Sequence, residues 1–317
     1  MPESTATPGF VSGFVSLVGP PNAGKSTLLN ALVGAKLAIV SGKPQTTRTL
    51  IQGVLTTAQA QVVFLDTPGI HTPDSLFNRR MMEAIGAALA ERDVLIYVVD
   101  ASRGEPGEAE REGVELVRRS AATALLVLNK IDRVKPKDRL LPLIERYKAL
   151  HDFAGYLPVS ALKGQGVDAV REATIARLPQ GPAYFPSDYL TDQPERFLAA
   201  ELIREGLLEE TREEVPHSIA VLVERWEETP KLARISATIY VEREGQKGIV
   251  IGERGSMLKR VGTRARVEME AMFGRKVFLE LHVKVRPRWR ENPQFLNELD
   301  WRRTMGGGGE GEGPAGA

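Results

Sequence analysis

The chain has 317 residues, of which 42% are hydrophobic and 26% are charged, and its formal net charge is +1. This composition is typical of a globular protein with room for two domains. The sequence has no cysteine, which excludes disulfides, cysteine-ligated zinc and thiol nucleophiles and fits a reducing cytoplasm. No apolar run approaches the ~20 residues that cross a bilayer, and residues 1–12 are expected to be a disordered leader without signal-peptide features.

The first half of the chain alternates short apolar runs with helical stretches. This pattern predicts an α/β domain over residues 13–178 with a mostly parallel, six-stranded sheet. Only three residues, 58–60, separate the second strand from the third, so this pair is expected to form an antiparallel hairpin. The expected strands are 14–18, 49–57, 61–66, 94–100, 122–128 and 155–159.

A different pattern follows residues 179–194, which contain four prolines and are expected to form a linker. Residues 195–290 are predicted to fold as an α+β domain with the order α-β-β-α-α-β. Residues 291–317 are expected to be a C-terminal extension with a disordered, glycine-rich tail. The expected elements of the second domain are a helix over 195–212, strands near 218–227 and 233–243, a short helix before 252, a helix to 273 and a strand over 277–286.

The stretch that begins at Gly19 fits the pattern G-x-x-x-x-G-K-[ST] between a predicted strand and a predicted helix. In such a loop the backbone N–H groups and the helix N-terminus face phosphate oxygens. Lys25 would reach the β- and γ-phosphates, and the Ser26 hydroxyl would ligate Mg²⁺. The alternative is a glycine-bearing turn that matches by chance. The candidate nucleotide-binding residues are Gly19, Pro20, Pro21, Asn22, Ala23, Gly24, Lys25, Ser26 and Thr27.

A second motif closes the third predicted strand, 41 residues after Lys25. An acid at a strand end, Asp66, can hold Mg²⁺ through water, and the N–H of Gly69 can bond a γ-phosphate. Asp-Thr-Pro-Gly is also an ordinary strand-to-turn sequence. The candidate nucleotide-binding residues in this motif are Asp66, Thr67, Pro68, Gly69 and Ile70.

A third motif, Asn129-Lys130-Ile131-Asp132, follows the apolar strand over 122–128. A buried Asp132 carboxylate would accept hydrogen bonds from guanine N1–H and the exocyclic amine, which adenine does not offer, so the site would reject ATP. Asn129 and Lys130 would brace the base and the loop. A polar strand end without function is the alternative for one such motif, but three motifs in this order favour nucleotide binding.

With these motifs the N-terminal domain resembles the translation-factor class of small GTPases, which implies a P-loop GTPase fold, GTP and GDP as ligands and Mg²⁺ as cofactor. The resemblance places Thr46-Thr47-Arg48 at switch I and Ser160 and Ala161 at a guanine-contacting loop. Thr46 and Thr47 compete, and we expect Thr47 to ligate Mg²⁺. The resemblance implies that the catalytic residues are Lys25, Thr47 and Gly69 and that the metal ligands are Ser26, Thr47 and Asp66.

The position that holds a water-orienting glutamine in Ras-like GTPases is Ile70 in this chain. An apolar side chain cannot orient water by hydrogen bonding, so slow intrinsic turnover or help from another group is expected. The neighbouring His71 is a possible base, although a histidine in a loop is more often simply solvated.

The formal charge of the second domain changes sign along the chain. Residues 201–228 hold nine acids and three bases, residues 241–266 seven bases and three acids, and residues 275–290 six bases and one acid. These blocks could form a salt-bridged surface. The basic blocks, however, surround a G-x-x-G loop between two predicted helices, where a nucleic-acid backbone could approach the main chain. The candidate RNA-binding residues are Gly252, Glu253, Arg254, Gly255, Lys259 and Arg260.

The order α-β-β-α-α-β with this loop resembles a type 2 KH domain, and the two domains together resemble the Era family of bacterial ribosome-assembly GTPases. The resemblance covers about residues 12–290 and includes residues 45–48, 185–192 and 241–247. It implies a cytoplasmic, monomeric GTPase that binds 16S ribosomal RNA near its 3′ end, and not DNA, during maturation of the 30S subunit. It also implies loose peripheral association with the inner membrane.

Two other functions fit parts of the sequence. A P-loop kinase acting on a metabolite would not need guanine recognition or a KH-like domain. A passive RNA-binding protein with a structural nucleotide domain would lack hydrolysis stimulated by RNA or by 30S particles.

Overall fold

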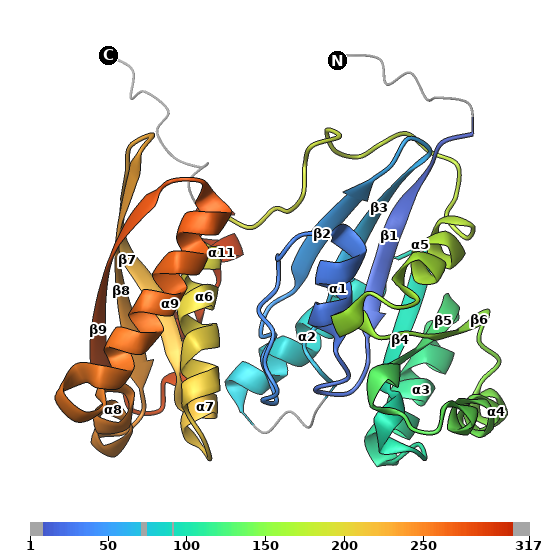
Figure 1. The fold of residues 1–317 in the computed structure, drawn as a ribbon, viewed down its shortest axis with the longest axis horizontal. Coiled ribbons are helices and arrows are strands. Elements are labelled where there is room, and N and C mark those ends of the chain that lie inside the picture. Colours follow the sequence, from blue (N-terminus) through green and yellow to red (C-terminus); the bar gives the residue numbers. More distant parts are fainter. Residues whose placement is uncertain (1–8, 71–74, 91, 307–317) are drawn as a thin grey trace, which may run out of the picture. The chain divides into compact units, whose positions relative to one another are not determined.

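The computed structural model describes residues 9–70, 75–90 and 92–306. They belong to two compact units (Figure 1). The N-terminal unit comprises residues 1–73 and 78–193, and the C-terminal unit comprises residues 74–77 and 194–317. Residues 1–8 of the expected leader, 307–317 of the expected tail and His71 lie outside the described residues.

The N-terminal unit is built on a six-stranded sheet with the order β2-β3-β1-β4-β5-β6. All neighbouring strands are parallel except β2 and β3, so both the mostly parallel sheet and the hairpin are confirmed. β1 begins inside the range expected to be leader, because Val11 and Ser12 pair with Ala60 and Gln61 of β3. The strands are β1 (Val11–Val18), β2 (Ile51–Thr56), β3 (Ala60–Asp66), β4 (Val94–Asp100), β5 (Thr123–Asn129) and β6 (Gly155–Pro158).

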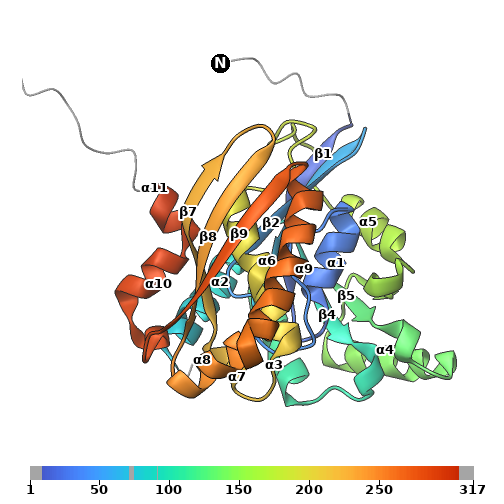
Figure 2. The ribbon, with the colours of Figure 1, turned by 60° about the vertical axis from the view of Figure 1, so that its left-hand side comes forward.

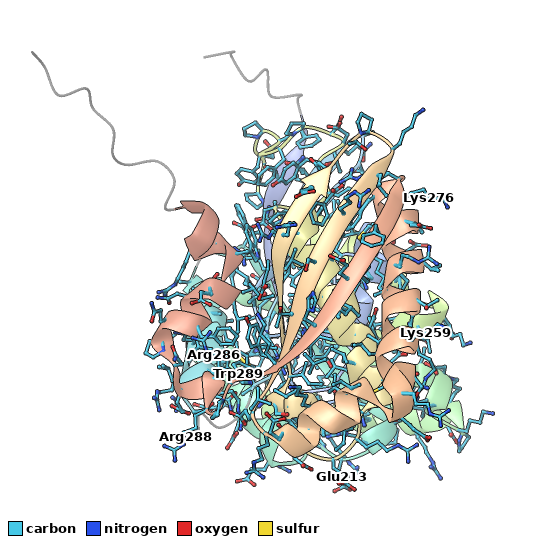
Figure 3. All side chains as sticks on the ribbon, turned by 90° about the vertical axis from the view of Figure 1, so that its left-hand side faces the viewer. Glu213, Lys259, Lys276, Arg286, Arg288 and Trp289 are labelled. Atoms are coloured by element: carbon cyan, nitrogen blue, oxygen red, sulfur yellow. The ribbon has the colours of Figure 1, made fainter. Side chains whose placement is uncertain are left out.

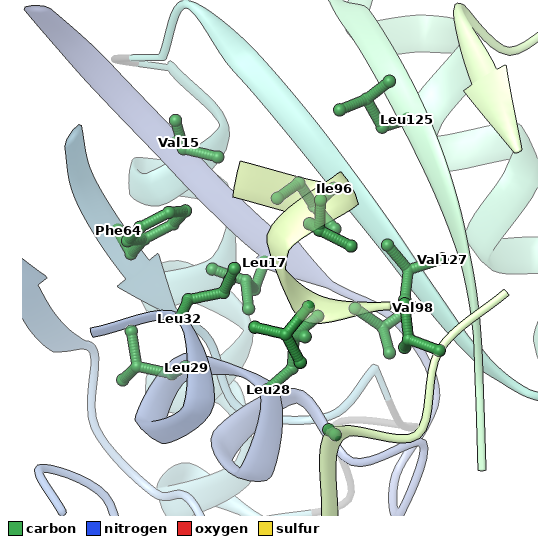
Figure 4. Close-up of a cluster of buried hydrophobic side chains, with 14 of the residues drawn as sticks. Val15, Leu17, Leu28, Leu29, Leu32, Phe64, Ile96, Val98, Leu125 and Val127 are labelled. Atoms are coloured by element: carbon green, nitrogen blue, oxygen red, sulfur yellow. The ribbon is translucent and has the colours of Figure 1, made fainter. Parts of the chain in front are cut away.

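Helices cover both faces of this sheet because its central strands are apolar on both sides. Consecutive side chains of a strand point to opposite faces, and Leu95 and Ile96 of β4 accordingly join different apolar clusters. Figure 4 shows one of them, in which Leu28 and Leu32 pack over Leu17. The helices are α1 (Lys25–Val33), α2 (Leu76–Ala90), α3 (Glu108–Ser120), α4 (Leu140–Leu150) and α5 (Val167–Ile175).

The proline-containing stretch before residue 194 packs along the edge of the N-terminal sheet. The N–H of Val54 donates to the carbonyl of Leu190 at 2.8 Å, which extends the hydrogen bonding of the edge strand β2. The rings of Phe185 and Tyr189 stack with centroids 4.6 Å apart and join an apolar cluster with Val54. The stretch expected to be a linker is therefore held against β2 over much of its length.

The C-terminal unit has a three-stranded sheet with the order β7-β8-β9 (Figure 2). β7 (Ala220–Glu228) is antiparallel to β8 (Leu232–Val241), and β9 (Lys276–Val285) is parallel to β8. The predicted order of elements is present, with a short additional helix, α7 (Val215–Ser218). The longer helices are α6 (Glu195–Glu210), α8 (Glu244–Ile251) and α9 (Ser256–Phe273).

Residues beyond 290 contribute to the core of the C-terminal unit. Phe295 of α10 (Pro293–Leu299) is fully buried, and its ring contacts Tyr240 with a centroid distance of 4.8 Å. Trp289 is also fully buried and donates from Nε1 to the carbonyl of Ser218 at 2.8 Å. A boundary at residue 290 would therefore divide side chains that pack together. The described chain ends in α11 (Trp301–Gly306).

Candidate functional site

The loop between β1 and α1 wraps around the amine of Lys25. Lys25 Nζ donates to the carbonyls of Gly19 and Pro20 at 3.0 and 3.2 Å. Gly24 has φ 94°, and a Cβ there would lie 2.3 Å from Asn129 Nδ2, so only glycine fits. Beside the loop is a cavity lined by Pro21, Asn22, Gly24, Lys25, Ser26, Thr27, Ile39, Val40, Ser41, Gln45, Thr46, Thr47 and Gly69.

Two opposite charges are buried at the base of this loop. Burial lowers the pKa of Lys25 to about 8, against the opposing effect of Asp66. Burial also raises the pKa of Asp66 to about 6, although Lys25 and hydrogen bonds from Ser26 and Thr47 act in the other direction. Desolvation is the largest cause of both pKa shifts. An anionic ligand would compensate the charge of Lys25, and a cation would compensate that of Asp66.

Three oxygen-bearing side chains meet next to Lys25. Ser26 Oγ lies 2.6 Å from both Thr47 Oγ1 and Asp66 Oδ2, and Thr47 Oγ1 lies 3.3 Å from Asp66 Oδ2. Thr46 instead donates to the carbonyl of Lys43 at 2.7 Å, so Thr47 is the threonine that reaches the cluster. Asp66 Oδ1 is buried and has no hydrogen-bond partner among the described residues. Such an oxygen set fits Mg²⁺, a hard cation.

The residues after Asp66 run against the loop. The N–H of Ile70 donates to the carbonyl of Gly19 at 3.3 Å, and Gly69 lines the cavity. Thr67 is fully buried, and its Oγ1 donates to the carbonyl of Leu17 at 2.8 Å. The Thr67 side chain thus anchors the segment to β1, while the backbone at Gly69 faces the cavity.

Asn129 and Lys130 tie the end of β5 to the phosphate-binding loop. Asn129 Nδ2 donates to the carbonyl of Ala23 at 2.9 Å, and Asn129 Oδ1 accepts from the N–H of Ala161 at 3.0 Å. Lys130 Nζ donates to the carbonyl of Asn22 and to Asp100 Oδ2, the latter at 2.8 Å. The sequence motifs did not identify Asp100 as a residue of the site. Its position at the carboxyl end of β4 could have indicated it, because ligands bind at this edge of parallel sheets.

Asp132 and Ser160 form a hydrogen-bonded pair beyond these residues. Ser160 Oγ donates to Asp132 Oδ1 at 2.6 Å, and this bond is the main reason that the pKa of Asp132 is lowered. Ser160 is fully buried, whereas Asp132 is partly exposed. Its side chain stays ionised and accessible to a base. Ile131 is buried, and its N–H donates to the carbonyl of Val159.

In the C-terminal unit, the G-x-x-G loop connects α8 to α9 as predicted. Gly252 has φ 72°, and a Cβ there would lie 2.8 Å from the backbone nitrogen of Met257. Gly255 and Arg254 also have positive φ, at 77° and 49°. Glu253 and Arg254 are exposed at the tip of the loop. The backbone therefore reaches solvent just before the N-terminus of α9, where anionic groups are favoured.

Most basic side chains of α9 are paired with acids. Arg260 contacts Glu210 of α6 at 2.9 Å, Arg264 contacts Glu209, and α9 also holds internal pairs. A salt-bridged surface thus accounts for part of the charge pattern. Among the described residues, Arg254 and Lys259 have no ion-pair partner, and Lys259 extends outward from α9 (Figure 3). These two are the free cations nearest the loop, whereas Arg260 is shared with Glu210.

The two units define a P-loop GTPase joined to a KH domain. Residues 14–130 match the family model described as 50S ribosome-binding GTPase, and residues 214–290 match the KH domain model. The chain is 47% identical to the GTPase Era of Syntrophus aciditrophicus, covering 92% of this chain and 95% of the relative. It is 48% identical to the GTPase Era of Geobacter metallireducens, covering 92% and 98%. The chain belongs to the Era family of GTPases.

Solved structures of Era share the fold of this chain. Era in complex with MgGDPNP and nucleotides 1506–1542 of 16S ribosomal RNA is 39% identical, with a TM-score of 0.89 over 92% of this chain and 99% of that chain. A point variant of Aquifex aeolicus Era bound to GDP·AlF4⁻ is 40% identical, with the same TM-score and coverage. Within the part of the chain that the structure describes, no helix is long and apolar enough to cross a membrane.

Proposed function

We propose that this protein is a GTP-driven switch that binds 16S ribosomal RNA near its 3′ end and acts in assembly of the 30S subunit. The observation that carries the proposal is the likeness, over 92% of the chain, to an Era structure in complex with MgGDPNP and this part of the RNA. We extend the proposal to a cytoplasmic monomer that attaches loosely to the inner face of the cell membrane, for which the family resemblance is the support.

In this proposal the loop from Gly19 to Thr27 cradles the phosphates of GTP. Lys25 would exchange its bonds to the loop carbonyls for bonds to the β- and γ-phosphates, and the N–H of Gly69 would contact the γ-phosphate. Asp132 would accept from guanine, with Ser160 fixing the carboxylate and Asn129 and Lys130 fixing the loop. Asp66 Oδ1, which is buried and has no hydrogen-bond partner among the described residues, supports metal binding by Ser26, Thr47 and Asp66.

When bound, Mg²⁺ would neutralise charge on the β- and γ-phosphate oxygens. The protein's own part in hydrolysis is to position GTP so that water can attack the γ-phosphate in line with the bond that breaks. The Ile70 side chain has no polar atom with which to orient the water, so this task would pass to other groups that line the cavity, such as the backbone of Gly69 and the Thr47 hydroxyl. Lys25 would stabilise the charge that develops on the transferred group.

The effect of Mg²⁺ on GTP affinity is expected to decline below about pH 6. A proton on Asp66, whose pKa is raised to about 6, competes with the cation. The apparent affinity for Mg²⁺ should then fall about tenfold per pH unit in this range. Magnesium titrations of GTP binding between pH 5 and pH 8 measure the effect. A Mg²⁺ affinity that stays constant down to pH 5 would show that Asp66 does not take part in metal binding.

The same pKa predicts an opposite trend for the stability of the nucleotide-free protein. Because the pKa of Asp66 is higher in the folded state than its usual value of 3.8, the folded state binds more protons between pH 3.8 and about 6. The contribution of Asp66 to stability is therefore largest below this range and is lost as the pH rises through it.

The experiment that tests the proposed function is a comparison of RNA affinity in three nucleotide states. A fragment from the 3′ end of 16S RNA is titrated with protein bound to a non-hydrolysable GTP analogue, to GDP or to no nucleotide. We expect the analogue to raise RNA affinity by a coupling of about 1–3 kcal/mol, and linkage requires RNA to tighten the analogue by the same factor. Equal affinity in all three states would contradict the switch and leave a GTPase and an RNA-binding domain that act independently.

A pair of neighbouring threonines supplies the control. Thr47→Ala should weaken this coupling more than it weakens GDP binding, because in the proposed switch Thr47, whose hydroxyl lies in the Ser26–Asp66 cluster, senses the third phosphate, which GDP lacks. Thr46→Ala should leave the coupling close to that of the wild type, because its hydroxyl bonds to Lys43 instead.

Changing both tip residues of the G-x-x-G loop to aspartate should weaken RNA binding. Arg254→Asp reverses a charge that has no ion-pair partner among the described residues, and Glu253→Asp keeps its charge. Each lost phosphate contact should reduce the slope of log affinity against log salt by about 0.7 for single-stranded RNA. Arg225→Asp, on β7, makes the same change of charge at an exposed site paired with Glu227 and serves as the control. RNA affinity that is indifferent to salt and to the loop variant would reject binding through this loop.

A further inference from the structure

The N-terminal unit has a second hollow, near the carboxyl ends of β4 and β5. Its volume is about 250 Å³, far more than one water molecule requires. It lies between the segment that follows β4 and the start of α4, and it shares no lining residue with the nucleotide cavity. It is therefore a separate feature of this unit.

The rim of the hollow carries four cations, Arg133, Lys135, Arg139 and Arg146, all of which are exposed. Among the described residues that line it, no side chain is acidic. Arg146 contacts Glu105 at 2.8 Å, but both side chains are largely exposed, so this pair is weak. The other three cations have no ion-pair partner among the described residues. A concave site lined by one sign of charge concentrates ions of the opposite sign.

The floor of the hollow is apolar. Val134 and Leu143 line it and are buried, and Pro142 lies beside them. Guanidinium groups recognise phosphate through paired hydrogen bonds, and an apolar floor accommodates the uncharged part of the same ligand.

We propose that this hollow is a second phosphate-binding site, distinct from the GTP site, which takes a phosphate group carried on a nucleoside. Two sources share this chemistry: a free nucleotide and a nucleotide within the backbone of single-stranded RNA. The hollow also adjoins both parts of the guanine-binding apparatus, because Ala101 follows Asp100, the partner of Lys130, and Arg133 follows Asp132. A ligand there would contact the same two chain segments that hold the base-recognition loop.

The test uses the full chain with its GTP site filled by GDP and Mg²⁺. Uridine diphosphate, which lacks the guanine hydrogen-bond pattern, is the probe for a free nucleotide. Single-stranded oligouridylate is the probe for RNA, and it is applied to protein that also carries Glu253→Asp and Arg254→Asp, which reduces binding through the KH loop. The pocket variant is Arg139→Glu with Arg146→Glu, and the control is Arg119→Glu with Lys148→Glu, two exposed cations outside the hollow.

A free-nucleotide site predicts that uridine diphosphate binds wild type and control equally and binds the pocket variant at least tenfold more weakly. An RNA site predicts this loss for oligouridylate, with a salt slope that is lower by about 1.4 for two lost phosphate contacts. Either result supports the proposal. Equal binding of both probes to the pocket variant and the control, or no binding of either probe to wild type, would overturn it.

A failure of the pocket variant to fold would be detected by circular dichroism with thermal unfolding. The neutral pair Arg139→Gln and Arg146→Gln then takes its place, since it removes the same contacts without adding acids. Because GDP affinity and RNA binding through the KH loop are measured separately, a negative result here is distinguishable from failure of the proposed function.

Discussion

Replacing Asp132 with asparagine is expected to change the preferred nucleotide from GTP to xanthosine triphosphate. The carboxylate would accept from guanine N1–H and the exocyclic amine, whereas the asparagine amide would meet that amine with a donor of its own. Xanthine offers an acceptor at this position. Loss of a charged hydrogen-bonding pair in the bound state should weaken GTP binding by on the order of 2–5 kcal/mol.

The structure explains why this substitution should leave the rest of the site intact. Ser160 Oγ donates to Asp132 Oδ1, and the amide oxygen of asparagine can accept the same bond. Asp132 is partly exposed, so the change should affect folding stability little. The loop itself is held by Asn129 and Lys130, which are unchanged.

Competition binding of GTP and xanthosine triphosphate measures the change in preference. Asp138→Asn is a matched control, because Asp138 is an exposed acid in a nearby turn that lines neither the nucleotide cavity nor the second hollow. If the Asp132→Asn variant still prefers GTP to the same extent, Asp132 does not recognise the base.

Much of the N-terminal unit could be predicted because its strands are buried on both faces. A strand such as β4, in which six of seven residues are buried, reads as a continuous apolar run with polar residues at its carboxyl end. The motif positions follow from the same arrangement, since the ends of β3 and β5 bring Asp66 and Asn129 to the edge of the sheet where the loop after β1 also lies. The choice of Thr47 over Thr46 agrees with where the two hydroxyls lie.

Contacts between residues distant in the sequence could not be predicted. The bond from Lys130 to Asp100 joins the ends of two strands, and no local pattern indicates it. The pairing of Arg260 with Glu210 depends on how α9 packs on α6, so the charge blocks alone could not show which cations stay free. Likewise, burial of Phe295 depends on contacts with Tyr240 and Trp289, whereas its local sequence resembles a polar extension.

Replacing Lys25 is expected to abolish tight GTP binding. The amine would bond to two phosphate groups, and hydrogen bonds to charged groups contribute about 1.5–3 kcal/mol each. Two such bonds correspond to a loss of about 3–6 kcal/mol, or on the order of 100-fold to 10,000-fold in affinity. Because the residue is buried, with a relative exposure of 6%, methionine is a better probe than alanine: it keeps most of the side-chain volume.

Folding stability separates this binding role from a structural one. Burial lowers the pKa of Lys25 to about 8, so an uncharged side chain relieves a desolvation penalty. The same change leaves the carbonyls of Gly19 and Pro20 without their donor and Asp66 without its nearby positive charge. These effects oppose each other, so Lys25→Met should unfold at a temperature close to that of the wild type while its GTP affinity collapses. Circular dichroism with thermal unfolding, beside nucleotide titration, measures both. A variant that is largely unfolded at room temperature, or one that is folded and still binds GTP tightly, would contradict the role assigned to Lys25.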